Sequence, residues 1–200
     1  MSQVNRYTAV LLMALLGAGC ASTPPSTFYT LGPLTAATEA GEAIKGGRLA
    51  IGIGPIDFPD YLERPQLVSR TSTHRLSVDE LHRWGGSLPE DFLRVLSENL
   101  TQLLATSRVV LLPGEARFAL DLQVVAEVLA FEARDSGEAL LKLRWAVLDP
   151  ESGGVLQVRE SSYRKALVGS DPEAQVRGLS EVLAAFSREL AGELRDLKRA

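Results

Sequence analysis

This sequence of 200 residues has few cysteines and histidines and no excess of positive charge, and each of these features argues against a class of function. A single cysteine cannot form an intramolecular disulfide, so the fold must depend on packing alone. The 21 lysines and arginines are outnumbered by 25 aspartates and glutamates, which gives a formal net charge of −4. Because no strong positive field exists to hold a phosphate backbone, we expect no nucleic-acid partner.

Sequence patterns for catalysis and metal binding are also lacking. Gly52-Ile53-Gly54 follows a predicted strand, but it has no third glycine and is followed by a proline instead of a helix, so it predicts no dinucleotide site. His74 and His82 lack the spacing of a helical metal-binding pair, and such histidines are more often surface residues. No serine lies in a nucleophile elbow. We therefore predict no catalytic residues and no metal site.

The first twenty residues differ in character from the rest of the chain. Arg6 is the only charged residue before an aliphatic run at residues 9–16, and three small residues follow at 17–19. This run is too short for a membrane-spanning helix, which needs roughly 18 or more apolar residues. A charged start, a short apolar stretch and small residues are typical of a secretory signal peptide. The pattern predicts export and cleavage of residues 1–19.

Cys20, the only cysteine, directly follows the small residues. This is the position of the lipidated residue in a bacterial lipobox, and it predicts acylation of Cys20 with chains such as palmitate. The alternative is a chance structural cysteine, and the leucine usual three positions earlier is replaced by Gly17. Ala21 after the cysteine, in place of Asp, resembles a lipoprotein retained in the outer membrane. We predict a flexible tether at residues 20–27 and a single periplasmic domain at 28–200.

The remaining sequence predicts an α+β fold with a largely antiparallel sheet packed by two main helices. Alternating apolar residues at 118–130 and again at 141–147 predict a hairpin. Ser87 and Glu90 form a capping box, and Asp171-Pro172 opens a second helix whose Leu183, Phe186 and Leu190 we expect in the core instead of in a coiled coil. Further strands are expected at residues 28–31, 48–54, 67–72, 75–78, 108–112 and 155–167, and the helices at 87–105 and 171–197.

The segment around residues 59–70 has features of a protein contact site. Its prolines stiffen the backbone, so that Tyr61, Leu62 and Arg64 are presented at low entropic cost, and such side chains are common interface anchors. The alternative is that Tyr61 and Leu62 cap the core while Arg64 pairs with an acidic residue. The sequence leaves both possibilities open.

Residues 51–70 read IGIGPIDFPDYLERPQLVSR, which resembles the signature of the PqiC (paraquat-inducible protein C) family. Residues 28–31, Trp84 and Asn99-Leu100 are similar to the pattern of the same family. These proteins are auxiliary lipoproteins of ABC-type and MCE-protein transport systems. The resemblance implies an outer-membrane-anchored domain facing the periplasm, an MCE-domain partner, no cofactor and no enzymatic activity. It adds Arg70 and Trp84 to Tyr61, Leu62 and Arg64 as candidate partner-binding residues.

The function expected from these observations is a non-catalytic auxiliary lipoprotein of a transenvelope lipid transport system that supports membrane integrity. A periplasmic lipid-binding carrier is one alternative and would need an apolar cavity. An envelope hydrolase is another and would need a nucleophile beside a base in a cleft. A ring or other homo-oligomer remains open on the sequence alone.

Overall fold

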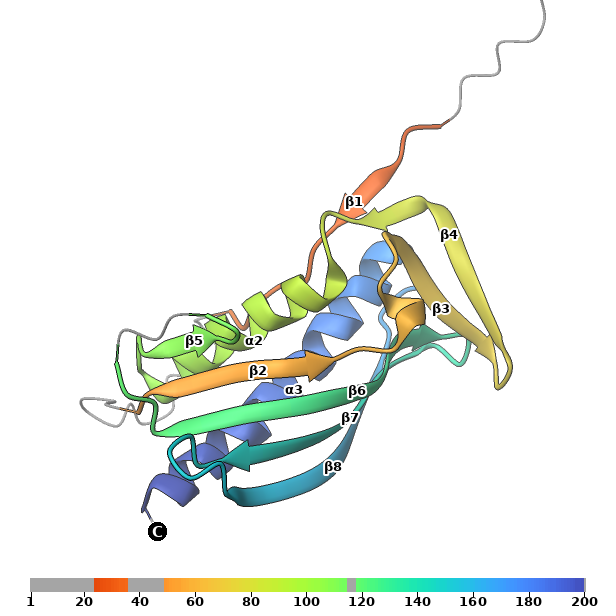
Figure 1. Ribbon diagram of the computed structural model, residues 1–200. Helices are drawn as coiled ribbons and strands as arrows, with labels where there is room; N and C mark the ends of the chain where they lie inside the picture. The colour runs from red at the N-terminus through yellow and green to blue at the C-terminus, as the bar shows by residue number, and fades with distance from the viewer. Residues whose placement is uncertain (1–23, 36–48, 115–117, 200) are drawn as a thin grey trace, which may run out of the picture.

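The computed structural model describes residues 24–35, 49–114 and 118–199. Cys20 and the predicted signal peptide lie outside the described residues. One mixed sheet and two long helices make up the fold (Figure 1). The elements are β1 (Thr27–Tyr29), β2 (Ile51–Asp57), the 3-10 turn η1 (Asp60–Leu62), β3 (Gln66–Ser72), β4 (Arg75–Trp84), α2 (Leu88–Leu104), β5 (Val109–Leu111), β6 (Leu122–Arg134), β7 (Glu138–Leu148), β8 (Val155–Ala166) and α3 (Pro172–Arg199).

Strand β6 is the centre of the sheet. One of its edges pairs with β7 in a long antiparallel ladder, and β7 pairs in the same way with β8. The other edge is shared, because β2 runs parallel to its first half and β3 joins it only at Ala133 and Arg134. The antiparallel β3–β4 hairpin continues the sheet to β1, and β5 lies beyond β2. The longest ladders are antiparallel, which confirms the predicted α+β class.

The two helices pack against each other and against the sheet. α3 contacts β6, β7 and β8, while α2 contacts β2 and β5. Aromatic side chains join the layers: the rings of Phe92 and Phe131 meet edge to face at 5.3 Å, and those of Trp145 and Phe186 at 6.0 Å. Leu183, Phe186 and Leu190 are completely buried, as predicted. The last helix therefore covers the sheet, and the coiled-coil alternative is wrong.

Both predicted helix starts are confirmed. Ser87 caps α2, its side chain accepting the backbone N–H of Glu90, and a proline occupies the first turn. At the start of α3, Asp171 Oδ1 accepts the N–H of Ala174 at 2.8 Å. Such caps satisfy amide groups that have no partner within the helix, which is why short polar residues at these positions mark helix boundaries.

Strand boundaries differ from prediction where tertiary contacts decide them. Pro55 does not end β2, because the strand resumes pairing with β6 at Ile56 after a register shift that needs no N–H from the proline. β4 extends to Trp84 because it pairs with β3 on one side and β1 on the other. β6 begins at Leu122 instead of residue 118, since the Asp121 N–H and carboxylate bond the backbone of Ala50.

The N-terminal segment is fastened to both helices, and its bond to α3 is the one that the Gly32 N–H donates to Ser180 Oγ at 3.0 Å. Asp91 Oδ2 accepts the N–H of Leu31 at 2.6 Å, and Asn99 Oδ1 accepts that of Leu34 at 2.7 Å. Asn99 is completely buried, and its Nδ2 donates to Ser187 Oγ of α3 at 3.0 Å. Strand β1 extends from the body at the end that carries the β3–β4 hairpin, whereas α3 ends at the opposite end (Figure 1).

Candidate functional site

The predicted contact segment connects β2 to β3 and bends away from the edge of β6. Pro59 precedes η1, its carbonyl accepting the N–H of Leu62 at 2.9 Å. At the other end, the Pro65 carbonyl accepts the N–H of Trp84 at 2.7 Å. A proline has a carbonyl acceptor but no backbone N–H that needs a partner. The hydrogen bonds to the two proline carbonyls therefore hold the connection at both of its ends.

A buried carboxylate, that of Glu132, lies beneath this connection. The side chain is completely buried; Tyr61 Oη donates to its Oε2 at 2.9 Å, and Arg70 Nε donates to its Oε1. The guanidinium of Arg70 also lies over the Tyr61 ring, 5.7 Å from the ring centroid. Arg134 Nη2 approaches the same carboxylate at 3.6 Å. We call these four residues the Glu132 cluster.

The protonation states in the Glu132 cluster follow from this geometry. Burial, together with the adjacent carboxylate of Glu132, raises the pKa of Tyr61 to about 12. The hydrogen bond to Glu132 raises the pKa of Arg70 further, against the effect of burial. Tyr61 is therefore a neutral donor and Arg70 a cation at neutral pH. A buried charge needs such partners to be tolerated, so the cluster joins η1, β3 and β6.

The candidate partner-binding residues separate into buried and accessible ones. Leu62 and Trp84 are only 3% and 5% exposed and belong to the core. Tyr61 is half-buried, with its hydroxyl committed to Glu132. These positions favour the alternative in which Tyr61 and Leu62 cap the core. Trp84 is not presented to a partner, because its side chain packs among core residues.

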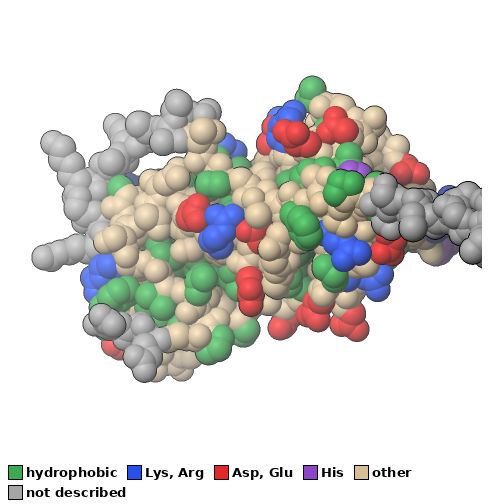
Figure 2. All heavy atoms as spheres, turned by 90° about the horizontal axis from the view of Figure 1, so that it is seen from above, with side chains coloured by type: hydrophobic (Ala, Val, Ile, Leu, Met, Phe, Trp, Pro, Cys, Tyr) green, Lys and Arg blue, Asp and Glu red, His purple; other side chains and the backbone are tan. Residues whose placement is uncertain are grey.

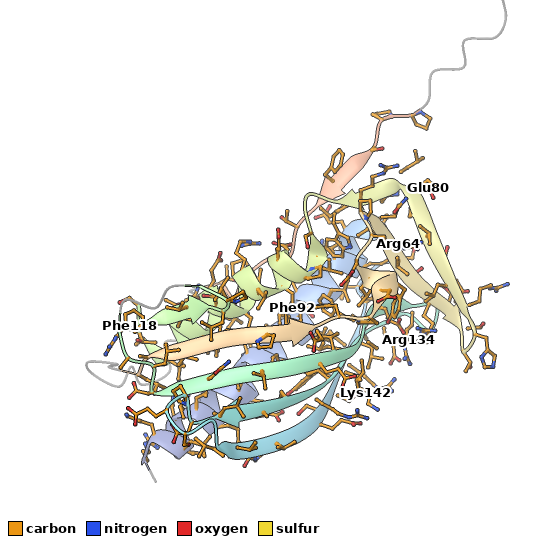
Figure 3. The ribbon with its side chains drawn as sticks, viewed as in Figure 1. Arg64, Glu80, Phe92, Phe118, Arg134 and Lys142 are labelled. Atoms are coloured by element: carbon orange, nitrogen blue, oxygen red, sulfur yellow. The ribbon has the colours of Figure 1, made fainter. Side chains whose placement is uncertain are left out.

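Arg64 is the exposed member of the predicted set. Within the part of the chain that the structure describes, it makes no hydrogen bond or ion pair, so the predicted pairing with an acidic residue is absent there. Arg64 and Arg134 lie at the same end of the molecule, near η1 and the end of β6 (Figure 3). This end therefore carries one exposed arginine, Arg64, and one half-buried arginine, Arg134.

Glu132 and Arg134 were not predicted as functional residues, because the strand expected from the sequence ended at residue 130. β6 instead continues to Arg134, with a register shift between Val128 and Ala130. The shift turns Phe131 toward Phe92 on α2, so Glu132 points away from Phe131, toward η1 and β3. The alternation of Glu132 and Arg134 with apolar residues indicated that the strand continues. The β-bulge before them, however, has no reliable sequence pattern.

His82 has a carboxylate neighbour, which bears on the hydrolase alternative. Its Nδ1 lies 2.8 Å from Asp79 Oδ2, and its ring lies 5.9 Å from that of Tyr29. Among the described residues, no serine hydrogen-bonds to His82, and no group of three or more metal-ligating side chains occurs. The His82–Asp79 pair is thus one of the histidine hydrogen bonds that would favour the hydrolase alternative, but among the described residues no serine nucleophile is bonded to this histidine.

The charged side chains of the face above α2 are mixed. Acidic and basic groups lie beside one another there, with hydrophobic side chains between them (Figure 2). Arg94 illustrates the pattern, because it pairs with Asp91 at 2.6 Å and Glu98 at 2.8 Å. Within the described ranges, no helix is long and apolar enough to cross a bilayer.

Comparison with known structures supports the fold. A crystal structure of an uncharacterized protein superposes with a TM-score of 0.69 at 19% identity, covering 86% of this chain and 99% of the other. A crystal structure of a protein from Xanthomonas campestris gives a TM-score of 0.64 at 14% identity, covering 84% and 91%. At such identities the likeness shows a shared fold. No curated protein matches the sequence.

The sequence profile of one protein family matches residues 29–191, and its description is ABC-type transport auxiliary lipoprotein component. The match covers most of the chain, including every strand from β2 to β8 and most of α3. It confirms the family resemblance that residues 51–70 indicated. The chain belongs to the family of ABC-type transport auxiliary lipoprotein components.

Proposed function

We propose that this lipoprotein is a non-catalytic subunit that is anchored to the outer membrane through Cys20 and docks a transenvelope lipid transport system there, so supporting membrane integrity. The partner in this proposal is an MCE-domain protein of an ABC-type system. Family membership supports an auxiliary role in transport. The lack of a nucleophile beside His82, among the described residues, supports a binding role over an enzymatic one.

The observation that carries this proposal is the attachment of the N-terminal segment at one end of the domain. β1 pairs with β4, and the hydrogen bonds of Leu31 and Leu34 fasten the following residues to α2. The tether proposed for residues 20–27 reaches at most about 25 Å, because an extended chain spans roughly 3.3–3.6 Å per residue. The β3–β4 end, where Arg64 also lies, would therefore face the membrane, and a transport partner that contacts Arg64 would dock close to the membrane surface.

Two measurements test the membrane attachment. Cys20→Ala should release the protein into the soluble periplasmic fraction, because each buried acyl methylene contributes about 0.8 kcal/mol and several chains together hold a domain on a bilayer. Intact mass of the parent protein should show acyl groups on the mature chain. Salt-resistant membrane association of Cys20→Ala, together with a parent protein free of acyl groups, would refute the lipoprotein anchor.

Partner docking is tested by copurification with an MCE-domain protein encoded beside this one. The parent should retain that protein, whereas Arg64→Ala should retain less, since loss of an interface anchor costs about 2 kcal/mol or more. Arg177→Ala is the matched control, because Arg177 is an exposed arginine on α3. No retention by the parent would count against the transport partner, and equal retention by both variants would count against Arg64 as a contact.

A lipid-binding carrier is the second candidate function. One shallow hollow of about 390 Å³ on the sheet is lined partly by apolar residues, including Pro55, Val125, Ala146 and Val158. Native mass spectrometry of the purified protein distinguishes the two functions. Copurified phospholipid released only on unfolding would favour the carrier, and lipid-free protein would favour docking.

A further inference from the structure

A second polar site lies where the turn of the β3–β4 hairpin meets the β6–β7 turn. It is a pocket of about 410 Å³. Arg70 and Arg134 contribute to its lining, together with hydroxyl-bearing residues that include Thr73 and Ser136. The two turns are held together by the backbone, since Asp135 N–H donates to the Arg70 carbonyl at 3.1 Å. This backbone hydrogen bond holds the polar residues on the two sides of the pocket next to each other.

Arg134 has donors that the protein does not use. Its Nη2 and Nη1 lie 3.6 Å from Glu132 and 3.7 Å from Glu138, beyond hydrogen-bond distance. Its Nε is enclosed and finds no acceptor among the described residues. Buried donors are nearly always paired in proteins, so the unpaired Nε shows that the described residues do not fully satisfy this guanidinium. Arg70 differs, because it donates to Glu132 and to the Thr73 carbonyl.

The neighbouring carboxylates leave Arg134 without a hydrogen-bonded acidic partner. Arg70 and Arg134 share one buried carboxylate, that of Glu132. Glu138 is engaged more closely by Arg164, at 2.7 Å, than by Arg134. Asp135 lines the pocket as well, but its side chain is exposed to solvent and screened. Arg134 therefore lies 3.6 and 3.7 Å from two carboxylates but, unlike Arg70 and Arg164, hydrogen-bonds to neither.

We propose that this pocket binds a phosphate group, with Arg134 as the principal ligand and the hydroxyls of Thr73 and Ser136 as additional donors. Guanidinium groups bind phosphate oxygens through paired, charge-assisted hydrogen bonds, and flanking hydroxyls satisfy the remaining oxygens. Inorganic phosphate and a phospholipid headgroup offer the same chemistry. The inference rests on the pocket alone and does not depend on the transport partner.

The test is isothermal titration of the full-length protein in nonionic detergent. Inorganic phosphate is one probe, and dihexanoyl phosphatidylglycerol is the other. Arg134→Gln should weaken binding by about tenfold or more, because it removes a charged two-pronged contact. Arg177→Gln on α3 should leave it unchanged, since Arg177 is exposed and lies outside the pocket lining.

The two probes distinguish the source of the phosphate. Binding of both points to a general phosphate site, and binding of the lipid alone points to a headgroup site. Absence of binding by the parent, or equal binding by the parent and Arg134→Gln, overturns the proposal. Should Arg134→Gln fail to fold, Arg134→Lys keeps the charge near Glu132 and Glu138 but lacks the guanidinium fork. Weaker binding by this second variant supports the site, and parental affinity overturns it.

Discussion

Two regions of the sheet are stabilised in different ways. One is its body, strands β6, β7 and β8, and the other is its hairpin end, formed by the β2–β3 connection and the β3–β4 hairpin. In the body, β6, β7 and β8 pair along their lengths with neighbours in sequence, and α3 buries their apolar face. At the hairpin end, the β2–β3 connection meets β6 through the polar Glu132 cluster, whose partners lie 62 and 71 residues away in sequence. The first region follows from hydrophobic periodicity. The second depends on long-range polar contacts.

Phe186→Ala should produce the largest loss, and it tests whether the body carries the stability of the domain. Phe186 is completely buried and contacts Trp145 and Tyr163. Its truncation should lower the free energy of unfolding by about 3–5 kcal/mol in urea denaturation. Phe28→Ala is the control, because Phe28 is 64% exposed. Equal, small effects of the two variants would contradict a core role for α3.

Glu132→Gln should have the next largest effect and tests the hairpin end. It leaves the guanidinium of Arg70 facing a neutral amide, and loss of one partner of a buried pair costs about 3–5 kcal/mol. We expect a loss of stability near the lower limit of this range, because the Arg70 side chain is itself 25% exposed. Glu160→Gln is the control, since that carboxylate is 43% exposed. A parental melting temperature for Glu132→Gln would show that the cluster contributes nothing to folding.

Tyr61→Phe should cost less, about 1.5–3 kcal/mol at most, because it removes one hydrogen bond to a charged acceptor. It should also alter the response to alkaline pH. The pKa of Tyr61 is raised to about 12, above its value in the unfolded chain, so its contribution is present below pH 10 and is lost between pH 10 and 12. Unfolding titrations should show a shallower decline for Tyr61→Phe. Identical slopes would show that Tyr61 titrates normally.

Arg64→Ala should have the smallest effect on folding, within about 0.5 kcal/mol, since the side chain is exposed. This variant separates the accessible part of the hairpin end from its buried part. Thermal melts of Arg64→Ala and the parent should coincide, even where partner binding differs. A clear drop in melting temperature would instead assign Arg64 to the folding of the β2–β3 connection.

The same contrast explains what the sequence predicts and what it does not. Both helices and the β6–β7 hairpin follow from caps and alternation, because each residue's environment there is set by its near neighbours. The path of β2 past Pro55 and the extension of β6 to Arg134 depend on pairing with distant strands. The partner-binding prediction identified a segment that takes part in a polar cluster, but burial of Leu62 and Trp84 could not be read from a local pattern.

The hydrogen bonds of Leu31 and Leu34 determine where a mechanical load on the N-terminal segment is carried. A pull toward the membrane first meets the short β1–β4 pairing and then reaches Asp91 and Asn99. Asn99 passes the load to Ser187, so tension that has passed the β1–β4 pairing at the edge of the sheet enters the junction of α2 and α3. A pulling experiment from the N-terminus would therefore record the loss of the β1–β4 pairing before the rupture of the hydrogen bonds to Asp91 and Asn99.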